Sequence, residues 1–143
     1  MSLKKLITLL NKPQPEFYSR FEEAIRIGNI LKDKRMFRRS DGWAIRRKAC
    51  HVACFVAMVM KDLGSKNETY PIFEIQKWMR LAGRPNYLID NRTIISTLQF
   101  FVRLGVFFMK QKANCKGGIS QEKQRVYGLN CDSEYLLDML GAF

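Results

Sequence analysis

Apolar residues recur at three- and four-residue spacing along most of the chain, a pattern that predicts helices. The first two predicted helices cover residues 3–11 and 16–34. Pro13 and Pro15 separate them, because proline interrupts a helix but is tolerated at the start of the next one. The residues expected on the inner face of the second helix are Phe17, Phe21, Ala24, Ile25, Gly28 and Leu31.

The most apolar helix is predicted from about Trp43 to Leu63, and Gly64 follows it as a natural C-terminal residue. This helix should lie at the centre of the core, because apolar residues cover much of its circumference. Its first turns carry Arg46, Arg47 and Lys48, so we expect that end of the helix to stay in water.

The pattern changes after this helix. Residues 69–72 suffice only for a brief strand, and residues 72–82 fit a helix. A further helix is predicted from Arg92 to Leu104, with Asp90 or Asn91 as its N-terminal cap. The residues expected on its inner face are Ile94, Ile95, Leu98, Phe101 and Val102.

A β-hairpin is predicted next, with strands at 106–112 and 123–129. The loop between them, residues 113–122, contains the pair Gly117-Gly118. A last helix is expected at 133–140. The predicted fold is therefore mainly α with a small β-hairpin.

Composition narrows the class of protein. The length of 143 residues suits one domain with an appended helical segment, and 47% apolar residues exclude a wholly disordered chain. The longest apolar run, Val52–Met60, is far shorter than the roughly 20 residues of a membrane-spanning helix, so no membrane partner is expected. Residues 1–7 lack a long apolar stretch, which argues against secretion and predicts a cytoplasmic protein.

Charge adds most to this picture. The formal net charge is +12, and such an excess is typical of a protein that binds a polyanion, above all nucleic acid. Residues 1–48 carry 13 basic against 5 acidic residues, and the densest stretch is 32–48. The candidate phosphate-contacting cluster consists of Arg35, Arg38, Arg39, Arg46, Arg47 and Lys48. The alternative is a basic loop that contacts only solvent.

From residue 44 to residue 130 the predicted order is long helix, loop, helix, turn, helix and hairpin. Three segments add a characteristic sequence shape, namely 91–98 (NRTIISTL), 103–106 (RLGV) and 125–129 (RVYGL). In this order and shape the chain resembles the winged helix-turn-helix family. The resemblance implies three parts: a basic helical extension at 1–43, a winged helix domain at 44–130 and a C-terminal helix at 131–143.

The resemblance implies that the helix at 92–104 lies in a DNA major groove. Its outer face carries guanidinium, hydroxyl and amide groups without a carboxylate, and such groups bond to base edges. The expected reading residues are Arg92, Thr93, Ser96, Gln99 and Arg103. Phe100 shares this face and is better suited to stack on a neighbouring element. The alternative is a polar face that contacts only water.

The predicted hairpin carries five cations against one carboxylate, Glu122. The resemblance implies that its tip lies along the DNA backbone or in a minor groove, and Gly117-Gly118 would let the tip bend. The candidate wing contacts are Lys110, Lys112, Lys116, Lys123 and Arg125. The alternative is an unbound loop.

The residues that usually support catalysis form no recognisable site. Cys50 and Cys54 lack the close-spaced second ligand pair of a structural zinc site, so we expect buried free thiols. His51 is expected to be partly exposed beside the basic cluster. Glu22-Glu23 is the only adjacent carboxylate pair, which gives poor support for a two-metal nuclease. We therefore expect a non-enzyme without cofactor or metal.

These features predict a protein that binds double-stranded DNA sequence-specifically, most simply a transcriptional regulator. Its small size and high basic fraction suit a virus- or plasmid-encoded protein, located at the nucleoid or in the host cell. The alternative is a winged-helix adaptor that binds a replication or transcription protein, with DNA affinity secondary. An exposed Phe100 and the seven methionines would favour this alternative.

The terminal helices bear on the oligomeric state. The helices at 3–11 and 16–34 and the C-terminal segment carry more apolar surface than one small domain needs. Pairing two reading helices on DNA requires a two-fold interface, so we expect a homodimer built from these segments. The alternative is that they fold back onto residues 52–63 and complete a monomeric core.

Overall fold

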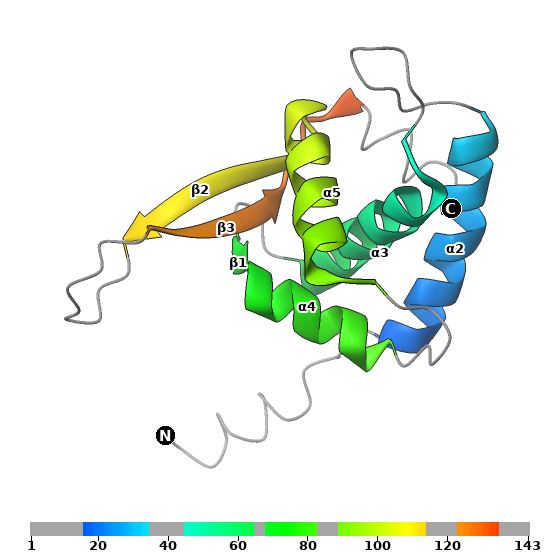
Figure 1. Ribbon diagram of the computed structural model, residues 1–143, viewed down its shortest axis with the longest axis horizontal. Helices are drawn as coiled ribbons and strands as arrows, with labels where there is room; N and C mark the ends of the chain where they lie inside the picture. The colour runs from blue at the N-terminus through cyan, green and yellow to red at the C-terminus, as the bar shows by residue number, and fades with distance from the viewer. Residues whose placement is uncertain (1–15, 35–44, 65–67, 83–88, 114–122, 135–143) are drawn as a thin grey trace.

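The computed structural model describes residues 16–34, 45–64, 68–82, 89–113 and 123–134, and it is mostly helical with a small antiparallel sheet (Figure 1). In chain order the elements are α2 (Phe17–Asp33), α3 (Arg47–Leu63), β1 (Tyr70–Pro71), α4 (Ile72–Leu81), α5 (Asn91–Arg103), β2 (Phe107–Ala113) and β3 (Lys123–Leu129). The prediction of a mainly α fold with a small β component is confirmed. The predicted helix at 3–11, and the one at 133–140 beyond residue 134, lie outside the described residues.

Helices α2 and α3 pack on each other and form the largest part of the core. The residues that α2 buries are Phe21, Ala24, Ile27, Gly28 and Leu31. In α3 every residue from 49 to 60 is buried, and its Phe55 ring meets the Phe21 ring edge-on at 5.1 Å between centroids. Gly28 permits this close approach, because a Cβ there would lie 2.7 Å from the His51 ring.

The apolar face of α2 is thus used inside the chain. This corrects the expectation that the helix at 16–34 supplies a dimer interface, since it packs on α3 as the alternative describes. Ile27 lies in the core, whereas Ile25, expected on the inner face, is only half-buried. The two helices share one hydrophobic core.

The ends of α3 are defined by backbone conformation. Arg46 is extended, with φ −64° and ψ 147°, so the helix begins at Arg47 and does not run through from Trp43 as predicted. At the other end Gly64 adopts φ 79° and its N–H bonds to the Met60 carbonyl at 3.3 Å. The predicted terminating role of Gly64 is confirmed.

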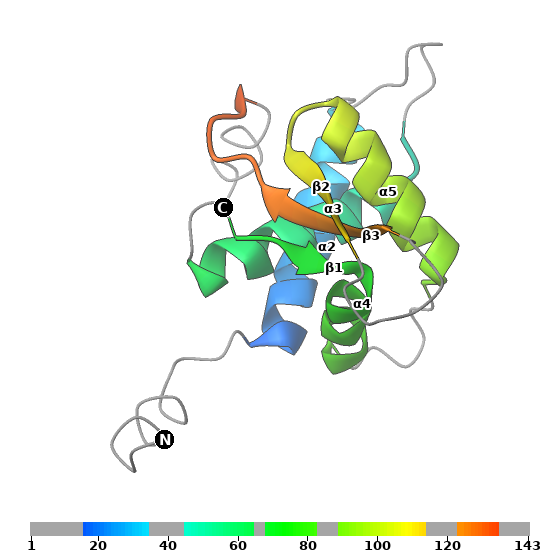
Figure 2. The same ribbon diagram turned by 90° about the vertical axis from the view of Figure 1, so that its left-hand side faces the viewer.

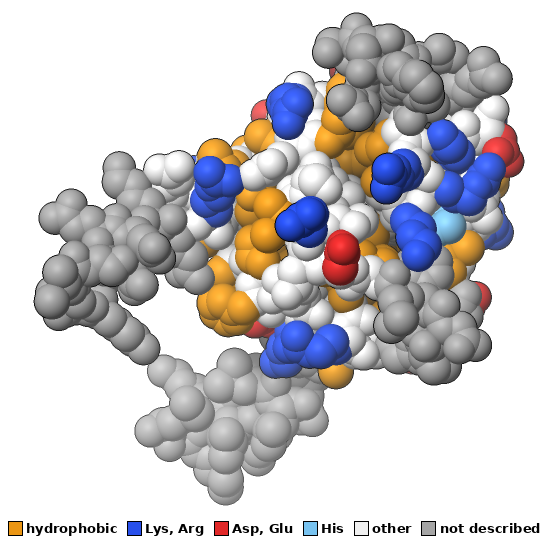
Figure 3. All heavy atoms as spheres, in the orientation of Figure 1, with side chains coloured by type: hydrophobic (Ala, Val, Ile, Leu, Met, Phe, Trp, Pro, Cys, Tyr) orange, Lys and Arg blue, Asp and Glu red, His pale blue; other side chains and the backbone are white. Residues whose placement is uncertain are grey.

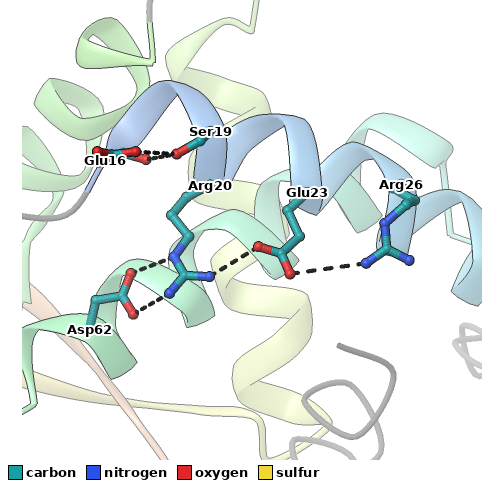
Figure 4. A network of polar contacts seen from close by, with 6 residues as sticks. All are labelled: Glu16, Ser19, Arg20, Glu23, Arg26 and Asp62. Atoms are coloured by element: carbon teal, nitrogen blue, oxygen red, sulfur yellow. Dashed lines mark hydrogen bonds and ion pairs between the residues drawn. The ribbon is translucent and has the colours of Figure 1, made fainter.

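An ion-pair network fastens the exposed side of α2 to the end of α3 (Figure 4). The Arg20 guanidinium donates two hydrogen bonds to the Asp62 carboxylate, at 2.7 and 2.9 Å. A third hydrogen bond from Arg20 reaches Glu23 at 3.0 Å. The parallel pair of bonds fixes the guanidinium plane and sets the position of one helix on the other.

The sheet has the strand order β1-β3-β2, so the brief first strand pairs with the last strand of the hairpin. Tyr70 lies opposite Tyr127 in one ladder, and in the other the register runs from Phe107–Leu129 to Ala113–Lys123. Seen along the hairpin, α5 lies to one side of the sheet and the C-terminal end of α3 to the other (Figure 2). The hairpin projects away from the helices (Figure 1).

The connection from α5 to β2 is tight. Gly105 adopts φ 83°, a conformation that other residues rarely take, and the Val106 N–H bonds back to the Phe101 carbonyl at 2.9 Å. Asn130, which follows β3, donates from Nδ2 to the Gly105 carbonyl at 2.7 Å. These bonds fix the base of the hairpin to the end of α5.

Candidate nucleic-acid interface

Helix α5 starts with a side-chain cap. The Asp90 carboxylate accepts a hydrogen bond from the Thr93 backbone N–H at 2.8 Å, which satisfies one of the unpaired donors of the first turn. The same bond holds the pKa of Asp90 below its usual value. Of the two predicted caps, Asp90 is the one that the structure uses, and the helix begins at Asn91.

The inner face of α5 packs on α3 and β2. Its buried residues are Ile94, Thr97, Leu98 and Phe101. Ile95 and Val102, which were expected inside, are half-buried at the edge of the core. Thr97 was missed because a hydroxyl side chain gave no apolar signal.

The outer face of α5 presents the predicted reading residues. Arg92, Ser96 and Arg103 are exposed, while Thr93 and Gln99 are half-buried. With about 100° between successive residues, positions 92, 96, 99 and 103 form a narrow stripe about 16 Å long, and position 93 lies at its edge. We call Arg92, Ser96, Gln99 and Arg103 the α5 stripe. The Ser96 hydroxyl donates to the Thr93 carbonyl at 3.2 Å, which leaves its oxygen able to accept.

Phe100 belongs to the core boundary and not to the stripe. It is half-buried, packs against the hydrophobic core and meets the Phe101 ring edge-on at 5.4 Å. The expectation that it stacks on a neighbouring residue is confirmed. An exposed Phe100 was one argument for the adaptor alternative, and the structure removes it.

The hairpin divides its predicted contacts. Lys110 and Arg125 are exposed, but Lys110 is paired with Val126 and Arg125 with Gln111, so the two cations lie on opposite faces of the ribbon. Lys112 and Lys123 belong to the paired strands, whereas Lys116 lies outside the described residues. Lys110 also lies over the Phe108 ring, with Nζ 5.6 Å from its centroid.

The predicted basic cluster is described only at its end. Arg35, Arg38 and Arg39 lie outside the described residues, and Arg46, Arg47 and Lys48 are exposed at the start of α3. Arg47 donates to the Asn29 side-chain carbonyl at 3.0 Å and to the Asp33 carboxylate at 2.9 Å. Arg47 therefore joins α2 to α3, a role that its place in a basic run did not indicate.

Figure 3 shows Lys and Arg side chains spread over the face on which α5 lies, from the hairpin to the side where α2 and α3 meet. Few Asp and Glu side chains interrupt them there. Such an arrangement produces a positive potential over the whole face and attracts a polyanion more strongly than any single pair of charges.

His51 corrects a prediction, because it is buried and only 5% exposed. Its Nε2 lies 2.7 Å from the Asn29 carbonyl oxygen, an acceptor, so the ring proton is on Nε2. Burial, and next the nearby Arg47, lowers the pKa of His51 to about 4. The neutral ring is thus a structural contact between α2 and α3, and Gly28, which makes room for it, was the sequence signal.

Cys50 and Cys54 are buried free thiols, as predicted, and Cys131 is exposed. Burial raises the pKa of Cys50 to about 11 and raises that of Cys54 as well. Within the described ranges no three His, Cys, Asp or Glu side chains are grouped as metal ligands would be. None of the described helices is long and apolar enough to span a membrane.

The comparisons give this chain no relative. No protein-family model matches it, and neither the curated proteins nor the solved structures include a significant match. The order and geometry of its own elements are therefore the basis for any functional assignment.

Proposed function

We propose that the chain is a double-stranded DNA-binding protein of the winged helix-turn-helix type, with α5 as its reading helix. The observation that carries the proposal is the α5 stripe. It joins two exposed arginines, a hydroxyl and an amide along about 16 Å of helix, which corresponds to about five base pairs of major groove. Residues 91–103 include no Asp or Glu that would repel phosphate.

The topology supports the same proposal. In the winged helix-turn-helix family a long helix, a helix pair and a hairpin follow one another, and α3, α4, α5 and β2–β3 occur in that order. The brief β1 completes a three-stranded sheet by pairing with β3. Lys110 and Arg125, on opposite faces of the hairpin, suit a wing that lies between two phosphate backbones.

Binding to random duplex DNA at about 50 and about 200 mM salt tests the first part of the proposal. Micromolar affinity that falls steeply with salt is expected, and absence of binding at the lower salt would exclude DNA. Selection from a random duplex pool then tests sequence specificity, since a reading helix should enrich one short motif.

The variant R92A/S96A/R103A tests the role of α5. We expect it to fold normally, because the three side chains point away from the core, and to lose about 1–3 kcal/mol of discrimination per base contact. The matched control R26A/K61A removes the same two positive charges from α2 and α3. If both variants lower affinity for the selected and the random duplex equally, α5 does not read bases.

A further inference from the structure

Helix α4 exposes large apolar side chains on one side. Its inner side is buried through Ile75 and Trp78, and the Trp78 ring packs edge-on against Tyr70 at 5.0 Å. On its outer side Phe73 is 59% and Leu81 50% exposed. Among the described residues four large hydrophobic side chains are exposed, and α4 holds two of them.

Two exposed cations lie between these apolar residues. Lys77 and Arg80 fall within about 60° of Phe73 around the helix, and Leu81 lies about 80° away. Phe73 and Leu81 are eight residues apart, which is about 12 Å along the axis. We call Phe73, Lys77, Arg80 and Leu81 the α4 outer patch. Figure 3 shows hydrophobic side chains near the start of α4 and basic ones along its lower side.

The α4 outer patch differs chemically from the α5 stripe, which exposes no large apolar side chain. A phosphate backbone would satisfy Lys77 and Arg80 but would leave Phe73 and Leu81 without apolar cover. A second copy of the chain would bring the same two cations against themselves, on a protein that already carries +12. An occupant that satisfies all four residues must combine apolar side chains with carboxylates.

We propose that the α4 outer patch docks an acidic amphipathic helical segment of a partner protein. Such a segment would place two apolar side chains about two turns apart against Phe73 and Leu81, with Asp or Glu beside Lys77 and Arg80. The patch is small, so binding should be transient, with a dissociation constant of about 10–100 µM. This interaction is separate from the proposed DNA contact of α5.

Selection of a random 16-residue peptide library on the full chain tests the proposal. We expect the enriched peptides to be rich in Asp and Glu, with apolar residues seven or eight positions apart. The variant F73S/L81S should weaken their binding at least tenfold, whereas the control Y18S, which removes an equally exposed aromatic from α2, should not. The charge reversal K77E/R80E should abolish binding of acidic peptides and favour basic ones.

Several outcomes would overturn the proposal. Enriched peptides that bind parent and F73S/L81S equally, or that are indifferent to K77E/R80E, would mean that they dock elsewhere. Displacement of the peptide by duplex DNA, with F73S/L81S weakening DNA binding, would make DNA the occupant. Concentration-dependent dimerisation that F73S/L81S abolishes would assign the patch to a second copy. Peptide binding without any DNA binding would refute the proposed function alone.

Discussion

The α2–α3 contact and the outer face of α5 use the same residue types for opposite purposes. In the α2–α3 contact Arg20 and Arg47 are held by carboxylates of the chain itself, at 2.7–2.9 Å from Asp62 and at 2.9 Å from Asp33. On α5, Arg92 and Arg103 are exposed and make no ion pair with another described residue. A basic residue therefore indicates a nucleic-acid contact only once its own carboxylate partners have been examined.

Burial separates the two regions in the same way. The α2–α3 contact encloses a neutral histidine, two thiols and a glycine that admits the imidazole ring. The α5 stripe lies on a helix whose other side is in the core. Changes in the α2–α3 contact should thus alter the free energy of unfolding, and changes in the stripe should alter DNA recognition.

Replacing Gly28 should have the largest effect on stability. Gly28→Val adds three carbons where a single Cβ would already lie 2.7 Å from the His51 ring and 3.0 Å from its backbone nitrogen. We expect a loss of about 3 kcal/mol in urea unfolding, the upper part of the range for overpacked cores. Gly28→Ala should cost less, because better helix propensity offsets part of the clash. A neutral Gly28→Val would show that the two helices can move apart freely.

The pH dependence of stability should report His51. The pKa of His51 is lowered from 6.5 to about 4 in the folded protein, so the unfolded chain takes up a proton first as the pH falls. The free energy of unfolding should be highest above pH 6.5 and should decrease by up to about 3 kcal/mol as the pH reaches 4. Urea titrations over this interval measure the decrease.

His51→Gln provides the comparison for this effect. Glutamine does not titrate, so the difference between parent and variant isolates the histidine from carboxylates that protonate near the lower limit. The same slope in both proteins between pH 6.5 and 5 would contradict a buried neutral ring.

The Arg20–Asp62 pair should contribute less, because both side chains are partly exposed. A double-mutant cycle with R20A, D62A and the double variant should give a coupling energy of about 1 kcal/mol, reduced at high salt. DNA affinity at a fixed salt should change little with D62A. A coupling energy near zero would mean that apolar packing alone positions α2 on α3.

The smallest effect expected distinguishes two neighbouring arginines. Arg46→Gln should reduce the salt slope of DNA binding by about 0.9 if Arg46 contacts one phosphate. Arg47→Gln should change the slope less, because Arg47 is bound to Asp33, and it should instead lower stability by about 1 kcal/mol. Salt titrations and urea unfolding of the two variants decide this. Equal slopes would place both arginines at phosphates.

The sequence allowed good predictions wherever local chemistry determines the structure. Strand β3 has the predicted bounds, and α5 begins and ends within one residue of its prediction, because Asp90 caps the helix and Gly105 follows it. Helix α3 starts at Arg47 instead of Trp43, since periodicity alone does not mark where an extended residue interrupts it.

Contacts between elements distant in sequence were harder to predict. Buried His51 depends on Gly28 and Asn29 of another helix, and Arg47 depends on Asp33. No spacing within one segment encodes these pairs. The exposed residues of the stripe followed from helical geometry, whereas Phe73 and Leu81 were assigned no role because their exposure depends on what α4 packs against.

The three described thiols give the protein an internal chemical clock. Cys131 is exposed and should react with a thiol reagent at once, whereas Cys50 and Cys54 lie in the α2–α3 contact with raised pKa values. Their modification has to wait for this contact to open, so its rate measures how often the helices separate. An opening free energy of about 5.5 kcal/mol would slow labelling about ten-thousandfold. Mass spectrometry of the labelled peptides can follow this opening in native buffer, without denaturant and without DNA.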